Sequence, residues 1–181
     1  MRTVLTMPRG RLRPATTEDL DTLLGLLHEE EVRRYLCDNT MLPRETLAAM
    51  LTQSTQLDAR GLGLWMIEQP SGDCLGAAGL QPVPVEMSAV PTIAGFIEPI
   101  IALRPEYWGH GLAGEAMATL RDYARGSLRL AQLVAAVDEP NTRSHRMMQH
   151  CGFTPVGTTP GPANELILYR LQLSQDPCAQ D

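Results

Sequence analysis

The chain has 181 residues, with 15 Lys and Arg against 21 Asp and Glu, and a formal net charge of −6. This acidic balance argues against general nucleic-acid binding, which needs a basic surface to displace counterions. No apolar stretch reaches the roughly 20 residues that a membrane span requires. Hydrophobic residues make up 44% and charged residues 20% of the chain, values typical of one globular domain with a sizeable core.

The cysteines are spread along the chain without a C-x-x-C pair, which indicates neither a zinc site nor a redox motif. They are Cys37, Cys74, Cys151 and Cys178. Because no secretory signal precedes them, we expect reduced thiols in a cytoplasmic protein, and no metal. We expect a single domain over residues 1–181, with 1–10 and 174–181 flexible.

The N-terminal half is predicted to run from a strand through helices to a hairpin. Leu20, Leu23 and Leu27 recur at helical spacing and mark the buried side of the first helix. Pro43 suits the first turn of a later helix, because its missing N–H would be unpaired there. The expected elements are a strand at 11–14, helices at 16–28, 29–36 and 43–61, and strands at 64–68 and 74–80.

The C-terminal half is predicted to begin with a long loop at 81–91, which contains three prolines. A strand at 92–103 follows, where Pro99 indicates a bulge or an edge on one side. The remaining elements are expected to be a helix ending near Gly126, a strand at 130–137, a helix from Asn141 to Gly152, and strands at 153–156 and 166–173. Together they predict an α/β domain with a single mixed central sheet of about six to seven strands, flanked by about four helices.

The most informative stretch lies between the strand that ends at Leu103 and the helix that follows. It carries Gly109, Gly111 and Gly114, with no acidic residue between the first glycine and Glu115. The first N–H groups of a helix have no intrahelical partner, and the helix dipole is positive there. Without a Cβ in the way, an anion as bulky as a pyrophosphate can approach the main chain. The turn therefore predicts an anion site, although the same glycines also suit a turn without a ligand.

Two segments together resemble the GNAT superfamily of N-acetyltransferases. The first is Pro-Glu-Tyr-Trp-Gly-His-Gly-Leu-Ala-Gly-Glu-Ala at 105–116, and the second is Asn-x-x-Ser-x-Arg at 141–146 with Gly-Phe at 152–153. They are most similar to the branch that contains the ribosomal-protein N-terminal acetyltransferases. The element order over 11–173 also fits, so the resemblance implies a GNAT-like fold over nearly the whole chain.

The resemblance implies a site for coenzyme A. The end of the strand before the turn would pair its main chain with the pantetheine arm, much as an added strand pairs with a sheet edge. Asn141 would bond the cofactor arm or the acceptor, and Arg146 would reach the phosphates or stay on the helix surface. The implied cofactor residues are Ile101, Ala102, Leu103, Trp108, Gly109, His110, Gly111, Leu112, Ala113, Gly114, Asn141 and Arg146.

Acetyl transfer from a thioester to an amine needs a neutral amine, a stabilised oxyanion and a protonated leaving thiolate. The candidate base is Glu98, at the acidic position of the family's strand motif, acting through a water; the alternative is a solvated strand carboxylate. Many members of the family carry a tyrosine where Met148 stands. The remaining hydroxyl is that of Ser144, which could instead bond its own backbone while solvent protonates the thiolate. A main-chain N–H within 101–103 would meet the oxyanion.

The resemblance favours an N-acetyltransferase that moves an acetyl group from acetyl-CoA to a primary amine by direct attack in a ternary complex. The acceptor would be a protein N-terminus or a small-molecule amine, and the negative net charge slightly favours a cationic one. The alternative is a non-catalytic acyl-CoA-binding sensor or scaffold, because the tyrosine is missing. A homodimer through the last strands is implied only by family analogy.

Overall fold

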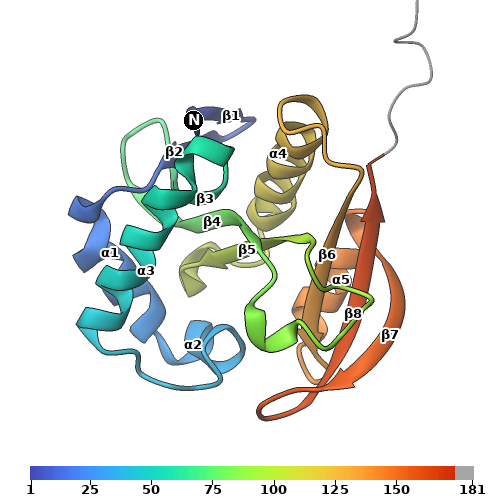
Figure 1. Ribbon diagram of the computed structural model, residues 1–181. Helices are drawn as coiled ribbons and strands as arrows, with labels where there is room; N and C mark the ends of the chain where they lie inside the picture. The colour runs from blue at the N-terminus through green and yellow to red at the C-terminus, as the bar shows by residue number, and fades with distance from the viewer. Residues whose placement is uncertain (174–181) are drawn as a thin grey trace, which may run out of the picture.

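The chain folds into an α/β structure whose strands form two sheets (Figure 1). The computed structural model describes residues 1–173; Cys178 and the tail expected to be flexible, 174–181, lie outside the described residues. The larger sheet has the order β1-β2-β3-β4-β5 and the smaller one β6-β8-β7. The strands are β1 (Leu5–Met7), β2 (Gly10–Pro14), β3 (Gly63–Glu68), β4 (Cys74–Pro82), β5 (Ile97–Leu103), β6 (Gln132–Asp138), β7 (Thr154–Pro160) and β8 (Glu165–Gln172).

Helices cover both faces of the larger sheet (Figure 1). Helices α1 to α3 pack on one face through a core that includes Leu26, Leu47 and Met66. Helix α4 packs on the other face, and its core also takes in side chains of β6 and β8, so one core joins the two sheets. The helices are α1 (Leu20–His28), α2 (Glu30–Leu36), α3 (Arg44–Gln56), α4 (Leu112–Gly126) and α5 (Thr142–His150).

The expected α/β class is confirmed, but the single central sheet is wrong. Strands β5 and β6 contact each other, yet no ladder joins them and the sheet divides at this point. Residues of both sheets belong to one core with α4, which joins the sheets where their strands diverge. Eight strands and five α-helices lie within 1–173. The strand that the sequence did not indicate is β1, and each of the five helices, including the short α2, falls in an expected range.

Residues 1–10 are not the flexible segment that we expected. Residues Leu5–Met7 pair with β2 as strand β1. The buried Arg2 guanidinium donates to Asp58 Oδ1 at 3.0 Å, and the indole N–H of Trp65 donates to the carbonyl of Thr3 at 2.9 Å. All these partners lie elsewhere in the fold, and no local period in ten residues signals such contacts.

Strand β5 is the edge of its sheet, and its ladder with β4 continues through Pro99 without a register shift. The N–H of Arg104 bonds the carbonyl of Leu75 at 2.9 Å, and bonds to a neighbouring strand alternate along an antiparallel strand. The residues that direct their main chain away from β4 are therefore Pro99, Ile101 and Leu103. The N–H that proline lacks falls on the open edge, where no ladder bond is lost. Pro99 is therefore tolerated because β5 is an edge strand, and no bulge is needed to accommodate it.

The strand expected at 92–103 begins only at Ile97. The residues before it form turns, in which the N–H of Ala94 bonds the carbonyl of Val90 at 2.9 Å and Gly95 has φ +78°. Ile93 is buried in a small core between this loop and the outer face of the three-stranded sheet. The apolar residues that suggest a longer strand therefore anchor a loop.

Gly76 lets β4 and β5 approach each other closely. A Cβ at this position would lie 2.1 Å from the carbonyl oxygen of Ala102 and 2.9 Å from Cα of Leu103. We expect Gly76→Ala to displace β5 and to lower the free energy of unfolding by about 1–3 kcal/mol in chemical denaturation. Gly25→Ala is the control, because Gly25 is exposed in α1 with no atom within 4 Å of the added Cβ. It should be neutral or stabilising by up to about 1 kcal/mol; equal stabilities of the two variants would contradict the packing argument.

Candidate functional site

Helix α4 begins at a glycine turn that leaves main-chain donors free. Its N-cap is Gly111, with φ +79°, and Gly109 before it has φ +78°. Glu115 makes the first bond back into the turn, from its N–H to the carbonyl of Gly111 at 3.1 Å. The N–H groups of Leu112 to Gly114 thus have no intrahelical partner, and they lie at the positive end of the helix dipole. This end of the helix suits an anion.

The glycines of the turn face open space. A Cβ at Gly109 or Gly114 would have no atom within 4 Å, and one at Gly111 would meet only the guanidinium of Arg9, at 3.5 Å. Packing therefore does not require small residues at these positions. The space next to the free N–H groups can hold a bulky group.

Trp108 fixes the turn to the end of β5. Its indole N–H donates to the carbonyl of Leu103 at 2.8 Å, and its ring packs against the cores on both faces of the larger sheet. Trp108 therefore ties the turn to the open edge of β5.

Two arginines that the sequence did not indicate flank the turn. Arg9, between β1 and β2, donates from Nη2 to the carbonyl of His110 at 2.6 Å and from Nε to Glu115 at 2.6 Å. Arg143, in the first turn of α5, lies over the Trp108 ring, 4.4 Å from its centroid. Arg9 lies in a segment without any pattern, and the spacing around Arg143 does not reveal which side of α5 faces the turn.

The start of α5 holds the second predicted set of residues. The side-chain oxygen of Asn141 accepts the N–H of Ser144 at 3.2 Å and caps the helix, which leaves its amide N–H groups as the donors available to a ligand. Ser144 is half-buried and Arg146 is exposed. Met148 is buried in the core, so α5 offers no hydroxyl at that position.

Glu98 lies on β5 on the opposite side of the sheet from α4. It has the same strand parity as Ala102, which packs with α1 to α3. The carboxyl is half-buried and accepts a bond from the side-chain amide of Gln81 at 3.2 Å. Burial raises the pKa of Glu98, and the Gln81 bond opposes this in part. Its carboxyl therefore accepts a proton at higher pH than an exposed glutamate does, as suits a general base.

These features form one continuous site along β5. Its open edge presents the main chain of Ile101 and the N–H of Leu103, whose carbonyl is bonded by Trp108. The edge ends at the glycine turn, and the stack of Arg143 on Trp108 joins the turn to α5. An extended chain that carries an anion at one end can lie along such an edge with the anion on the turn. The residues that the sequence assigns from Ile101 to Gly114 come together here.

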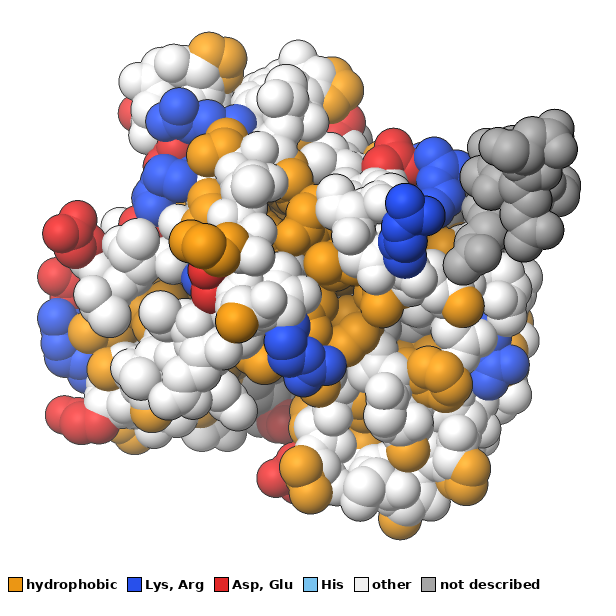
Figure 2. Space-filling model, turned by 45° about the horizontal axis from the view of Figure 1, so that its top comes forward, with side chains coloured by type: hydrophobic (Ala, Val, Ile, Leu, Met, Phe, Trp, Pro, Cys, Tyr) orange, Lys and Arg blue, Asp and Glu red, His pale blue; other side chains and the backbone are white. Residues whose placement is uncertain are grey.

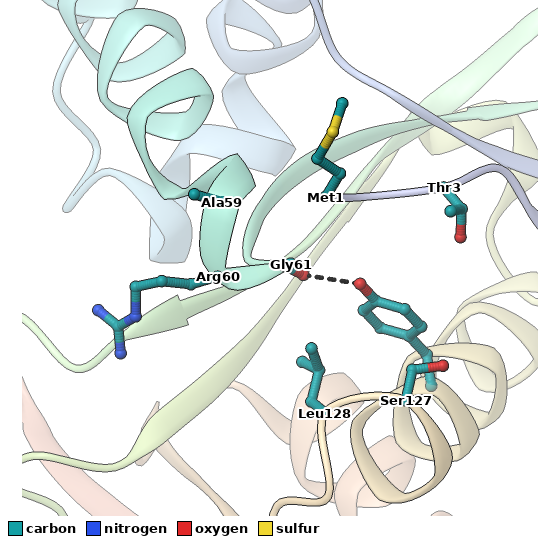
Figure 3. Close-up of a pocket in the computed structure, with 8 residues that line it drawn as sticks. Met1, Thr3, Ala59, Arg60, Gly61, Ser127 and Leu128 are labelled. Atoms are coloured by element: carbon teal, nitrogen blue, oxygen red, sulfur yellow. Dashed lines mark hydrogen bonds between the residues drawn. The ribbon is translucent and has the colours of Figure 1, made fainter.

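Two hollows on the molecular surface lie along α4. One of about 320 Å³ is lined by the N-terminal segment, residues 59–61 and the end of α4, where the hydroxyl of Tyr123 donates to the carbonyl of Gly61 at 3.1 Å (Figure 3). Figure 2 shows hydrophobic side chains gathered in a furrow along the middle of one face. The hollow at Tyr123 lies at the opposite end of α4 from Gly111 and is separate from the candidate site.

The cysteines in the described part of the chain are unpaired, and burial raises the pKa of the Cys37, Cys74 and Cys151 thiols. They are thus poor nucleophiles at neutral pH. Within 1–173, no group of three or more His, Cys, Asp and Glu is arranged to hold a metal ion. None of the described helices combines the length and apolar character needed to cross a membrane.

Comparisons with known proteins give one family and one fold. The sequence profile of the acetyltransferase (GNAT) domain matches residues 9–154. The uncharacterized N-acetyltransferase p20 of Bacillus licheniformis is 26% identical over 151 residues, which cover 82% of this chain and 81% of that protein.

Solved structures share the architecture. A putative GNAT-family acetyltransferase from Bordetella pertussis has a TM-score of 0.79 and 24% identity, covering 93% of this chain and 99% of that one. The ribosomal L7/L12 α-N-protein acetyltransferase RimL, solved in complex with coenzyme A, has a TM-score of 0.74 and 14% identity, covering 94% of this chain and 98% of that one. The expected GNAT-like fold is confirmed.

Gly114 allows the anion site to be tested without straining the backbone. It is helical, with open space at its Cβ. We expect Gly114→Leu to leave stability unchanged or raised, and to weaken coenzyme A binding at least about tenfold in calorimetry by blocking the free N–H groups. Gly126→Leu, at the far end of the same helix and also in open space, should bind like the parent. Equal affinity of both variants for coenzyme A would refute the site.

Proposed function

The chain belongs to the GNAT acetyltransferase family, and from this premise we propose that it moves an acetyl group from acetyl-CoA to a primary amine by direct attack in a ternary complex. The observation that carries the proposal is the open edge of β5 running into the uncapped, glycine-lined start of α4. Coenzyme A has a matching form, because an extended arm with two amide groups leads to a pyrophosphate.

The donor is proposed to lie along β5 with its phosphates on the turn. The N–H groups of Leu112 to Gly114 would bind the pyrophosphate, and the main chain of Ile101 would pair with the pantetheine arm. Arg9 and Arg143 flank the turn and would add positive charge near the phosphates. The coenzyme A in the RimL structure supports this donor.

Glu98 is proposed as the general base. An amine must lose its proton before its lone pair can attack, and a lysine-like amine is largely protonated at neutral pH. The half-buried carboxyl, with its raised pKa, would accept that proton directly or through a water. Its place on the other face of the sheet from α4 supports an approach of the amine from the side of α1 to α3.

The remaining steps use groups at the strand end and at the start of α5. The N–H of Ile101 or Leu103 on the open edge would hold the oxyanion of the tetrahedral intermediate. Ser144 is the hydroxyl proposed to protonate the leaving thiolate. A thiol is acidic enough, with a pKa of about 8.5, that solvent can also supply this proton. The buried Met148 favours the alternative of a non-catalytic acyl-CoA-binding protein, so turnover must be tested directly.

Release of free thiol from acetyl-CoA, measured with a panel of amines, separates the two functions. We expect release that depends on an amine, either a peptide with a free N-terminus or a small amine, and an acetylated product of matching mass. Tight binding of coenzyme A without turnover on any amine would refute the enzyme and favour the sensor or scaffold.

Replacement of Glu98 tests the base. We expect Glu98→Gln to lower kcat at neutral pH by about 100-fold, and the parent rate to fall as the pH drops through the raised pKa of Glu98. Ionising a carboxyl whose folded pKa is raised opposes folding at higher pH. The variant should therefore unfold at the parent temperature or above it at neutral pH, and lose this advantage in acid. An unchanged rate in the variant would exclude Glu98 as the base.

A further inference from the structure

We infer that Gln81 is a positioning residue for the transfer step, whose side-chain amide holds the carboxylate of Glu98 toward the acceptor amine. The inference rests on the proposed function, because it gives Glu98 its role. Gln81 lies at the end of β4, outside both sequence motifs.

The register of the sheet places the two side chains together. Gln81 and Glu98 are direct partners in the β4–β5 ladder, so both side chains point to the same face. The Gln81 amide donates to Oε1 of Glu98 at 3.2 Å. Oε1 is thereby engaged, and Oε2 is left to accept a proton.

No other side chain in this part of the ladder can perform this task. The next pairs on the same face are Gly79 with Ile100 and Ala77 with Ala102, and none of them carries a polar side chain. A carboxylate among apolar neighbours has few ways to hold one orientation. The amide of Gln81 supplies the one directional contact that this pair of strands offers.

The hydrogen bond also influences the pH range in which the Glu98 carboxyl is ionised. Burial raises the pKa of Glu98 and the Gln81 bond lowers it, and no charged side chain contributes to the shift. Helices α1 and α2 and strands β4 and β6 contact β5. The ionisable residues on these elements, on the loop after β4 and at the end of β5 are Asp21, His28, Glu30, Glu31, Arg33, Arg34, Tyr35, Cys74, Glu86, Arg104 and Asp138. Several of them are engaged elsewhere, such as His28 with the carbonyl of Leu42, and Asp138 with Asn164.

The proton and electron balance of the step shows what Gln81 contributes. The amine gives one proton to Glu98, directly or through a water, and its lone pair forms the new C–N bond at the thioester carbonyl. As the C–S bond breaks, its electron pair leaves with sulfur. The adduct nitrogen loses its second proton, which reaches the thiolate through Ser144 or solvent, and Glu98 releases its own proton to solvent. The donor amide of Gln81 stabilises the ionised carboxylate that starts this sequence.

The test is the pH profile of kcat/KM for the acceptor in Gln81→Leu. Loss of a hydrogen bond to the charged form raises the pKa of the carboxyl, so the acid limb should move to higher pH. We expect a loss of roughly three- to tenfold at pH values on the limb and a smaller loss on the alkaline plateau, where Glu98 is ionised in both proteins but is not held in one orientation in the variant. A uniform loss at every pH, or no change, would overturn the inference.

A matched control exists on the other sheet. Gln172 donates its side-chain amide to Gln132 across β8 and β6, also at 3.2 Å. Gln172→Leu removes the same type of cross-strand contact away from Glu98 and should keep the parent profile. Unfolding temperatures of both variants check that each is folded under the assay conditions.

Two further measurements separate this inference from the proposed function. In a Glu98→Gln background, Gln81→Leu should cause no further loss, because the group that it positions is gone. Titration of the Glu98 carboxyl by carbon NMR reports the effect of Gln81 without any turnover and should give a higher pKa in Gln81→Leu. An inactive parent with this NMR shift would refute the proposed function alone, whereas an active parent with identical titrations would refute the role of Gln81 alone.

Discussion

The uncapped start of α4 is the constraint on which the rest of the structure depends. Three successive N–H groups have no partner within the helix, and Gly111 has no side chain to satisfy them. Two side chains fix the position of these N–H groups. The indole of Trp108 bonds the carbonyl of Leu103 at the end of β5, and the guanidinium of Arg9, in the β1–β2 hairpin, bonds the carbonyl of His110 in the turn. An anion at this point meets donors that are already in place, so little ordering cost remains for binding.

The division of the sheet gives this anion site its extension. Strand β5 pairs with β4 on one side only, and the core shared by both sheets stabilises the divergence from β6. An edge strand normally invites unwanted pairing. Here the open edge is short and ends at the turn, so an extended ligand that pairs with it also reaches the free N–H groups. Gly76 and Pro99 both suit this arrangement, one by close approach to β5 and the other by lacking an N–H where no ladder bond is made.

The two faces of the larger sheet divide the proposed chemistry. Helix α4 and the glycine turn belong to one face, whereas Glu98 and Gln81 point to the face covered by α1 to α3. An acetyl donor along the edge of β5 and an amine on the side of α1 to α3 would occupy different places, so neither has to leave before the other binds. The proposed direct attack in a ternary complex is compatible with this layout, since it requires both substrates to be bound at once.

The sequence by itself determined the α/β class, most of the elements and the glycine turn, because periodicity and helix-start signals depend on neighbouring residues. It also indicated Glu98, but it gave no sign of Gln81, which the register of two strands places opposite. The tertiary structure alone decided that β1 is ordered, that the sheet divides after β5, and that Arg9 and Arg143 flank the turn. Each of these depends on contacts between segments far apart in the chain, and such contacts leave no local pattern in the residues that make them.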